Sequence, residues 1–295
     1  LPVALQVYTV RDYAERDFAD AMKKVKEIGY DYVELAGLYG HTVKEIRAAL
    51  RAAGVKAISA HVPVAELLAD TGATVATYKA VGVKYIVIPY APEDMRPGVA
   101  ENYDEVIKKI AYIGRICGEQ GIQLLYHNHD FEFVKMPDGS YGLDYLYSHL
   151  PAEYLQTELD LCWVKVSGLD PVEYLQKYYG RAPIVHYKDY VGNKTENMYE
   201  LIGTDTAHAE TSSEFAFRPL GQGVQDMPAI LEKTMEVYTK YVVGVGVNTT
   251  LICVPLIITS MYCFTPSSKK YIRYPSSTFS RNTSTPASAS STVAK

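Results

Sequence analysis

Short apolar runs rich in β-branched and aromatic residues alternate along the chain with longer amphipathic stretches. The runs predict strands at 4–8, 32–35, 57–61, 85–90, 122–129, 155–160 and 184–188, with an eighth candidate at 241–247. Between them, apolar residues recur at helical spacing in segments such as 18–28, 43–53, 103–120 and 171–179. Gly29, Gly54, Gly82 and Gly121 follow predicted helices, where a left-handed cap favours glycine. A repeated strand–helix unit is therefore expected.

Eight such units are typical of either a closed α/β barrel or a doubly wound sheet. Neither a GxGxxG motif nor a P-loop follows the first strand, which argues against the doubly wound sheet. Polar residues gather at the C-terminal ends of successive strands, where a barrel assembles its active site. We predict a (β/α)8 TIM barrel over residues 1–247, in which the eighth β/α unit is degenerate.

Composition narrows the function classes. The chain has 295 residues, which suits one barrel, and its net charge of -5 argues against a nucleic-acid partner. Its four cysteines form no CxxC pair, which is typical of reduced, intracellular proteins. No signal-peptide pattern is visible at the first residues. We expect a cytoplasmic protein with a small-molecule substrate and no membrane partner. The sequence is compatible with a homo-oligomer.

Three strands end in polar pairs that period-two alternation places on one face: His127 with His129, Glu158 with Asp160, and His186 with Lys188. Taken singly, each has a plain explanation, because strand-end histidines commonly form hydrogen bonds at a rim and Glu158 could pair with Lys188. Their occurrence on successive strands indicates a site. Converging buried charges need either mutual pairing or a cation, and mixed imidazole and carboxylate ligands suit Mn, Co, Zn or Mg.

Several motifs carry a family resemblance. They are Tyr-His-Asn-His-Asp-Phe-Glu-Phe at 126–133, Gln-Thr-Glu-Leu-Asp at 156–160 followed by Cys162 and Trp163, and Val-His-Tyr-Lys-Asp at 185–189. Segments 6–11, 34–37, 59–61 and 197–201 fit the same pattern. In this order, the motifs resemble the sugar phosphate isomerase/epimerase family, whose members are xylose-isomerase-like barrels. The resemblance runs from about residue 3 to about residue 243.

The resemblance implies a metal site at the ends of the last four strands, where relatives use Glu, Asp, His and Glu. Asp160 and His186 match the sixth- and seventh-strand ligands. The fifth-strand position holds His127, which makes Glu158 a candidate additional ligand or base. We therefore expect Asp160, His186, Glu158 and His127 as metal ligands. Without the usual carboxylates, Glu158, His127 or His129 would have to carry the acid–base chemistry.

Substrate contacts are also implied by the resemblance. His61 and Lys188 fall where relatives contact substrate oxygens, and Tyr8 is assigned to the same group. The chain departs from its relatives at the eighth strand, where Val245 occupies the position of their Glu. No acidic residue follows Glu236, so no later residue can replace that ligand.

Composition changes abruptly after Val247. Residues 251–264 are apolar but interrupted by Pro255, and 267–295 are rich in Ser, Thr and Pro with five basic and no acidic residues. We expect a divergent, disordered tail over 248–295. Its origin has three explanations: a membrane anchor, for which the apolar run is short, a replacement of the last helix, or a change of reading frame or splicing near Gly244. The third is favoured, because the resemblance stops abruptly.

The expected activity is that of an isomerase or epimerase acting on a keto-sugar or related polyol. A proton is removed beside a carbonyl that a metal polarises. The alternatives are a non-catalytic polyol- or metal-binding barrel and a lyase or dehydratase on the same metal platform, since ligands do not fix the reaction. An abasic-site endonuclease would need a basic face, which the charge counts against. Turnover with added Mn would separate an enzyme from a binding protein.

Overall fold

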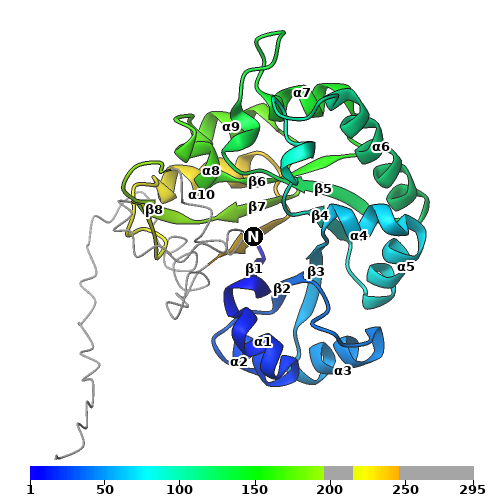
Figure 1. Ribbon diagram of the computed structural model, residues 1–295. Helices are drawn as coiled ribbons and strands as arrows, with labels where there is room; N and C mark the ends of the chain where they lie inside the picture. Colours follow the sequence, from blue (N-terminus) through cyan, green and yellow to red (C-terminus); the bar gives the residue numbers. More distant parts are fainter. Residues whose placement is uncertain (196–214, 246–295) are drawn as a thin grey trace, which may run out of the picture.

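The computed structural model describes residues 1–195 and 215–245. Within them, eight parallel strands close into a barrel in the order β1-β10-β7-β6-β5-β4-β3-β2 (Figure 1). The strands are β1 (Val3–Gln6), β2 (Tyr32–Ala36), β3 (Lys56–His61), β4 (Tyr85–Ile88), β5 (Gln123–His127), β6 (Gln156–Asp160), β7 (Ile184–Tyr187) and β10 (Tyr241–Gly244). The predicted TIM barrel is confirmed, although its first, fourth, fifth and eighth strands end two or three residues earlier than the sequence pattern predicts.

Helices surround the barrel between successive strands (Figure 1). They are α1 (Arg11–Arg16), α2 (Phe18–Glu27), α3 (Val43–Ala53), α4 (Val64–Ala69), α5 (Thr71–Val81), α6 (Tyr103–Glu119), α7 (Gly142–His149), α8 (Leu161–Val166), α9 (Pro171–Lys177) and α10 (Met227–Glu236). Local sequence sets their ends. Thr42 and Glu45 form a capping box at the start of α3, and Gly54 ends that helix at φ 72°.

The eighth barrel strand is regular where the structure describes it. Val242, Val243 and Gly244 pair in register with β7, and β10 also pairs with β1, so the first and last strands seal the barrel. The part of the predicted degenerate eighth unit that follows this strand, the tail 248–295 and the motif at 197–201 lie outside the described residues. No helix of the described part is both long and apolar enough to cross a membrane.

Two short elements lie beyond the barrel wall. β8 (Asp189–Val191), which directly follows β7, pairs antiparallel with β9 (Ala216–Arg218). The buried Asp189 carboxylate accepts hydrogen bonds from the backbone amides of Gly221, Gly223 and Gln225. This carboxylate therefore holds the loop after β9 against the end of β7.

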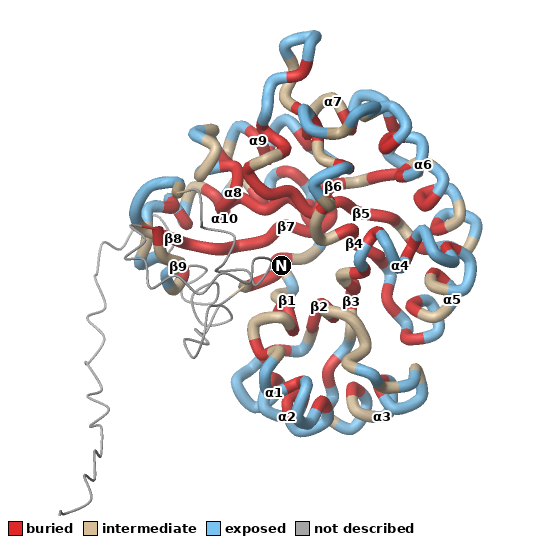
Figure 2. Tube along the Cα trace, in the orientation of Figure 1, coloured by how far each residue is buried: buried red, intermediate tan, exposed pale blue. Residues whose placement is uncertain are grey.

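Burial follows the layers of a barrel: the strands are buried and the outer faces of the helices are exposed (Figure 2). A large apolar cluster fills the space between strands and helices. A second, smaller cluster fills the barrel interior; it consists of Ala4, Ile58, Tyr85, Val87, Leu125, Ile184 and Val243. The polar residues of the site follow in the next inward-facing positions of several of these strands.

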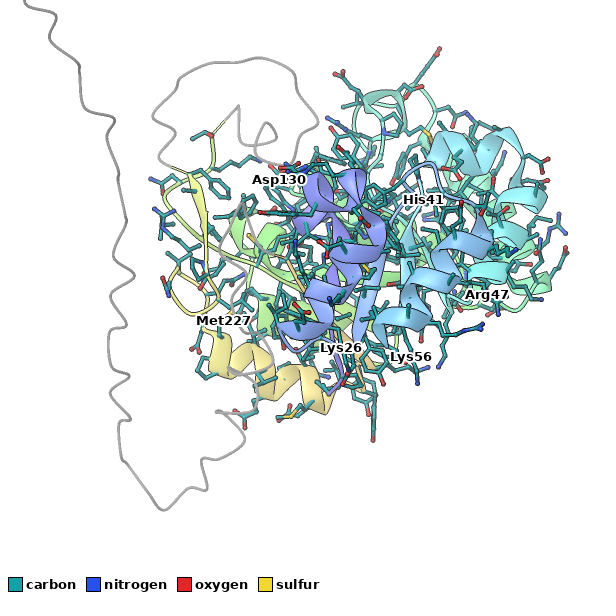
Figure 3. All side chains as sticks on the ribbon, turned by 90° about the horizontal axis from the view of Figure 1, so that it is seen from below. Lys26, His41, Arg47, Lys56, Asp130 and Met227 are labelled. Carbon is teal, nitrogen blue, oxygen red and sulfur yellow. The ribbon has the colours of Figure 1, made fainter. Side chains whose placement is uncertain are left out.

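The two ends of the barrel carry different residues. His41 and Asp130, which follow β2 and β5, lie at one end, whereas Lys26 and Lys56, which precede β2 and β3, lie towards the other (Figure 3). The strand-end motifs all belong to the first of these ends, where barrel enzymes place their chemistry. The interior apolar cluster separates that end from the opposite one.

Candidate metal centre

Four side chains from four different strands converge inside the barrel. His61 ends β3, His127 ends β5, Glu158 lies in β6 and His186 in β7. One potential ligand atom from each lies within 4.8 Å of all the others. Two ligands on opposite sides of a cation, each about 2.0–2.2 Å from it, are roughly 4.0–4.4 Å apart. The spacing and the donor chemistry therefore fit a divalent metal ion.

One carboxylate oxygen joins the three imidazoles. Glu158 Oε2 lies 2.7 Å from His61 Nε2, 2.9 Å from His127 Nδ1 and 3.1 Å from His186 Nε2. The His61 and His186 rings are stacked, with centroids 5.5 Å apart and planes at 8°. The other oxygen, Glu158 Oε1, is buried and has no hydrogen-bond partner within residues 1–195 and 215–245. Glu158 thus presents one engaged and one unengaged oxygen.

Glu34 of β2 is a fifth member of the cluster, and it is absent from the predicted site residues. Its Oε1 lies 2.8 Å from His186 Nε2 and 3.1 Å from His61 Nε2. Gln6 Nε2 donates to the same oxygen at 2.7 Å, and Ser59 Oγ donates to Oε2 at 2.5 Å. The sequence did hold a signal, since Glu34 is the one charged residue of an otherwise apolar strand and opens a motif that the family resemblance includes.

Asp160 lies beside the four-residue group, and its two carboxylate oxygens contact other partners. Its Oδ1 caps α8 by accepting from the amides of Cys162 and Trp163. Its Oδ2 lies 2.7 Å from Lys188 Nζ and 3.5 Å from His127 Nε2. The predicted substrate residue Lys188 is therefore the ion-pair partner of the predicted ligand Asp160, and both are buried.

Asn128 connects the ends of the strands that carry these groups. Its Oδ1 accepts from the Asp160 amide at 2.9 Å, and its Nδ2 donates to the Asp160 carbonyl at 3.2 Å. The side chain thereby imitates a strand backbone and extends the pairing of β5 with β6. This clamp sets the spacing between His127 and Asp160.

His129 stands one position further along the fifth strand's inward face. Its ring lies 5.2 Å from that of His127 and stacks on Phe131 at 5.3 Å. Trp163 approaches it at 5.4 Å. The ring is therefore held among aromatic side chains next to the metal candidates.

Tyr8 lies apart from the metal candidates, in a 3-10 turn (η1, Val7–Val10) that follows β1. Its amide donates to Gln6 Oε1 at 3.0 Å, and the Arg11 guanidinium lies 4.4 Å above its ring. Gln6 therefore connects Tyr8 to Glu34, because its Nε2 donates to the Glu34 carboxylate.

The histidines divide into two electrostatic classes. Burial alone would lower the pKa of His61 and His186, but the Glu34 and Glu158 carboxylates outweigh it and raise the two values to about 10 and about 9. Burial also lowers the pKa of His127 and His129, with no carboxylate among the main opposing causes, and nearby cationic groups lower both further. His127 and His129 are therefore neutral imidazoles, available as ligands or as acid–base groups.

The two carboxyls of the cluster are also pushed in opposite directions. Burial would raise the pKa of Glu34, but the adjacent His61 and His186 hold it well below the usual range. Burial and the negative charge of Glu34 raise the pKa of Glu158. Glu34 is thus the firmly ionised member, and Glu158 is the carboxyl more readily protonated, as a general base requires.

With this geometry in hand, the chain can be placed among known proteins. It belongs to the family of xylose isomerase-like TIM barrels, whose family model matches residues 22–243. A search of curated proteins found no match.

Solved structures share the fold. A sugar phosphate isomerase/epimerase from Parabacteroides distasonis ATCC 8503 is 22% identical with a TM-score of 0.66, over 85% of this chain and 92% of that chain. The probable 3-DHS dehydratase AsbF from Bacillus anthracis is 14% identical with a TM-score of 0.62, over 83% and 92%. The IOLI protein, whose structure contains a zinc atom, is 16% identical with a TM-score of 0.59, over 83% and 88%. At these identities, the likeness is one of fold.

Proposed function

We propose that this protein is a metal-dependent isomerase or epimerase that moves a proton on the carbon beside the carbonyl of a keto-sugar or related polyol. The observation that carries the proposal is the convergence of His61, His127, Glu158 and His186 on one small volume at the mouth of the barrel. Family membership and structural neighbours named as an isomerase/epimerase support the reaction class. A neighbour with bound zinc supports the metal.

The donor set favours particular ions. Three imidazole nitrogens suit Mn, Co or Zn better than Mg, which prefers oxygen ligands. When bound, such an ion would polarise the substrate carbonyl and stabilise the negative charge that develops on its oxygen. His61, which the family resemblance assigned to substrate, belongs to the metal ligands in this proposal because its Nε2 is part of the group.

In this proposal, side chains of the protein transfer the proton. Glu158 Oε1 is buried and unengaged within the described residues, so we assign it as the base that accepts the substrate proton. His129 is a neutral imidazole in the same mouth and is assigned as the group that returns a proton. The buried Trp163 ring and the partly buried Phe131 ring border His129 and limit the access of water to it.

Other groups orient the substrate in this proposal. Lys188 presents an ammonium held by Asp160, and Tyr8 follows β1 at the same end of the barrel; both are assigned to substrate oxygens. The prediction that Asp160 is itself a ligand stays a prediction, with its Oδ2 lying 3.5 Å from His127 Nε2.

The test begins with metal analysis of the purified protein and continues with a screen of keto-sugars in deuterated water. Solvent deuterium should appear at the carbon beside the carbonyl in the presence of Mn and should not appear after chelation. A protein that binds Mn and sugars but exchanges no proton would be a binding protein. Loss of water from the substrate would identify a dehydratase.

His186→Ala provides the first prediction. Divalent-metal affinity should fall by at least tenfold, since removing even a residue that only supports a ligand typically costs 10–100-fold. The melting temperature in metal-free buffer should fall as well, because the variant removes a buried partner of the Glu34 and Glu158 carboxylates. Unchanged Mn stoichiometry and affinity in calorimetric titration would contradict the site.

A further inference from the structure

Glu34 forms a closed ring of atoms with Glu158 and two histidines. Its Oε1 lies 2.8 Å from His186 Nε2 and 3.1 Å from His61 Nε2. Glu158 Oε2 lies 3.1 Å and 2.7 Å from the same two nitrogens. The two oxygens and two nitrogens therefore alternate at the corners of a quadrilateral of non-bonded contacts, called the ring below, whose four edges all fall between 2.7 and 3.1 Å.

Hydrogen bonds alone cannot account for all four of these short contacts. An imidazole Nε2 carries at most one proton, yet each of these two nitrogens faces carboxylate oxygens of two different residues. Adjacent ligands of an octahedral ion with bonds of about 2.1 Å are separated by roughly 3.0 Å. The four edges match that separation, so one cation inside the ring would contact all four atoms at once.

Charge balance also favours a second carboxylate. Glu158 alone leaves a divalent ion with an uncompensated positive charge in the barrel interior, which is costly. Asp160 is neutralised by Lys188 at 2.7 Å. The inward side chains of the eighth strand, Val243 and Val245, carry no ligand.

We propose that Glu34, on the second strand, is the second anionic ligand of the metal, an assignment that rests on the proposed function. Three imidazoles and two carboxylates then supply five ligands, and one position of an octahedral ion remains for a substrate oxygen. The carboxylate that balances the ion comes from β2 instead of from the strand that closes the barrel.

The surroundings of Glu34 suit a ligand that must keep its orientation. Gln6, its register partner on β1, donates to Oε1, and Ser59, its register partner on β3, donates to Oε2. A register shift between Val33 and Glu34 places Ser59 opposite the carboxylate. These neutral donors fix the carboxylate without neutralising it, as partners of metal ligands do.

The experiment compares Mn binding by the wild type, Glu34→Gln, Glu34→Asp and Glu132→Gln. Glu132 is the matched control, because it is an equally buried carboxyl of the same barrel whose hydrogen bonds go to Tyr126 and the His129 amide. Glu34→Gln should weaken Mn binding at least tenfold, and Glu34→Asp should lose less because it keeps the charge. Glu132→Gln should bind within about twofold of the wild type. Glu34→Gln with wild-type affinity would overturn the assignment.

The visible absorption of bound Co distinguishes a metal ligand from a residue that only orients the ligands. Loss of one ligand should change the intensity and position of its visible absorption, whereas a residue that only orients His61 and His186 should leave the spectrum unchanged. Should Glu34→Gln fail to fold, Gln6→Met keeps the carboxylate but removes its amide donor. That variant should then lose about tenfold in Mn affinity, and wild-type affinity would overturn the proposal.

The outcomes separate this assignment from the proposed function. If the wild type binds Mn and His186→Ala does not, but Glu34→Gln behaves as the wild type, only the role of Glu34 is wrong. A wild-type protein that binds no divalent metal would contradict both.

Discussion

Glu132 is a buried carboxyl whose protonation state the surrounding residues control. Burial raises its pKa to about 8, although hydrogen bonds from the Tyr126 hydroxyl and the His129 amide act in the opposite direction. Those two bonds, each 2.7 Å long, tie the residue to the segment that carries His127 and His129. At neutral pH it is therefore largely protonated, and it ionises as the pH rises through about 8.

Glu132→Gln should therefore flatten the pH dependence of stability. The contribution of Glu132 is fully present below its unfolded pKa near 4.5 and is lost as the pH rises through the folded value of about 8. An amide cannot ionise, yet it can accept from the His129 amide and bond to the Tyr126 hydroxyl. Between pH 5 and pH 8, the free energy of unfolding of the variant should rise relative to that of the wild type by up to about 1.4 kcal/mol per pH unit. Urea denaturation at a series of pH values provides the measurement.

The exposed Glu153 gives the control, since Glu153→Gln should leave the pH profile unchanged. A Glu132→Gln profile that runs parallel to that of the wild type would show that Glu132 is ionised throughout.

Single residues differ in how well the sequence revealed them. His127, Glu158 and His186 were predicted because each belongs to a polar pair at a strand end, where alternation alone places them on one face. Glu34 was missed because it is a lone acid inside a short apolar strand, and only the closed barrel brings it to His186. His61 was assigned to substrate from the family resemblance, and its 2.7 Å contact with Glu158, 97 positions away in the sequence, is visible only in the folded barrel.

At the level of elements, the eighth strand is intact in its pairing but contributes no ligand. Val245 continues the inward face of β10, packs against the interior cluster and donates its amide to the Tyr187 carbonyl at 3.2 Å. From the sequence, the family resemblance alone placed Val245 at the position of the relatives' Glu. The sequence pattern could not identify the antiparallel β8–β9 pair, whose position depends on the Asp189 carboxylate and the loop bound to it.

Val245→Glu tests whether this strand still faces the site. Without metal, the variant should be less stable than the wild type, because it buries an unpaired charge. With Mn, the gap should close or reverse as the new carboxylate gains a cation. Thermal melts of both proteins with and without Mn provide the measurement.

Val242→Glu is the matched control, since Val242 belongs to the outer apolar cluster between strands and helices. It should be destabilised equally with and without Mn. The same behaviour in Val245→Glu would show that the eighth strand does not reach the ion.

For the whole molecule, the candidate ligands lie on separate strands, so only the folded barrel presents them together. A saturating ion should therefore stabilise the native state. At a free concentration of 100 times the dissociation constant, the gain is about 2.7 kcal/mol, which corresponds to roughly 5–10 °C in melting temperature. Chelation should reverse the rise, and His186→Ala should show none of it. A wild-type melting temperature that is independent of Mn would contradict a site confined to the native state.

The fold class followed from the sequence because the strand–helix repeat and the glycine caps are local signals. Gly29, Gly54, Gly82 and Gly121 all have positive φ, as predicted from their places after helices. The composition of the site was less predictable, because it depends on which strands become neighbours across the barrel.

The contact between His186 and Glu34 joins residues 152 positions apart. Pairings between such distant segments form slowly, because the entropy of closing a long loop must be overcome before the contact contributes any stability. The first and last strands of the barrel must also meet, since β1 pairs with β10. A folding chain therefore acquires its local helices and neighbouring strands well before this pair of side chains. We therefore expect the chemistry of the protein to become available only late in folding.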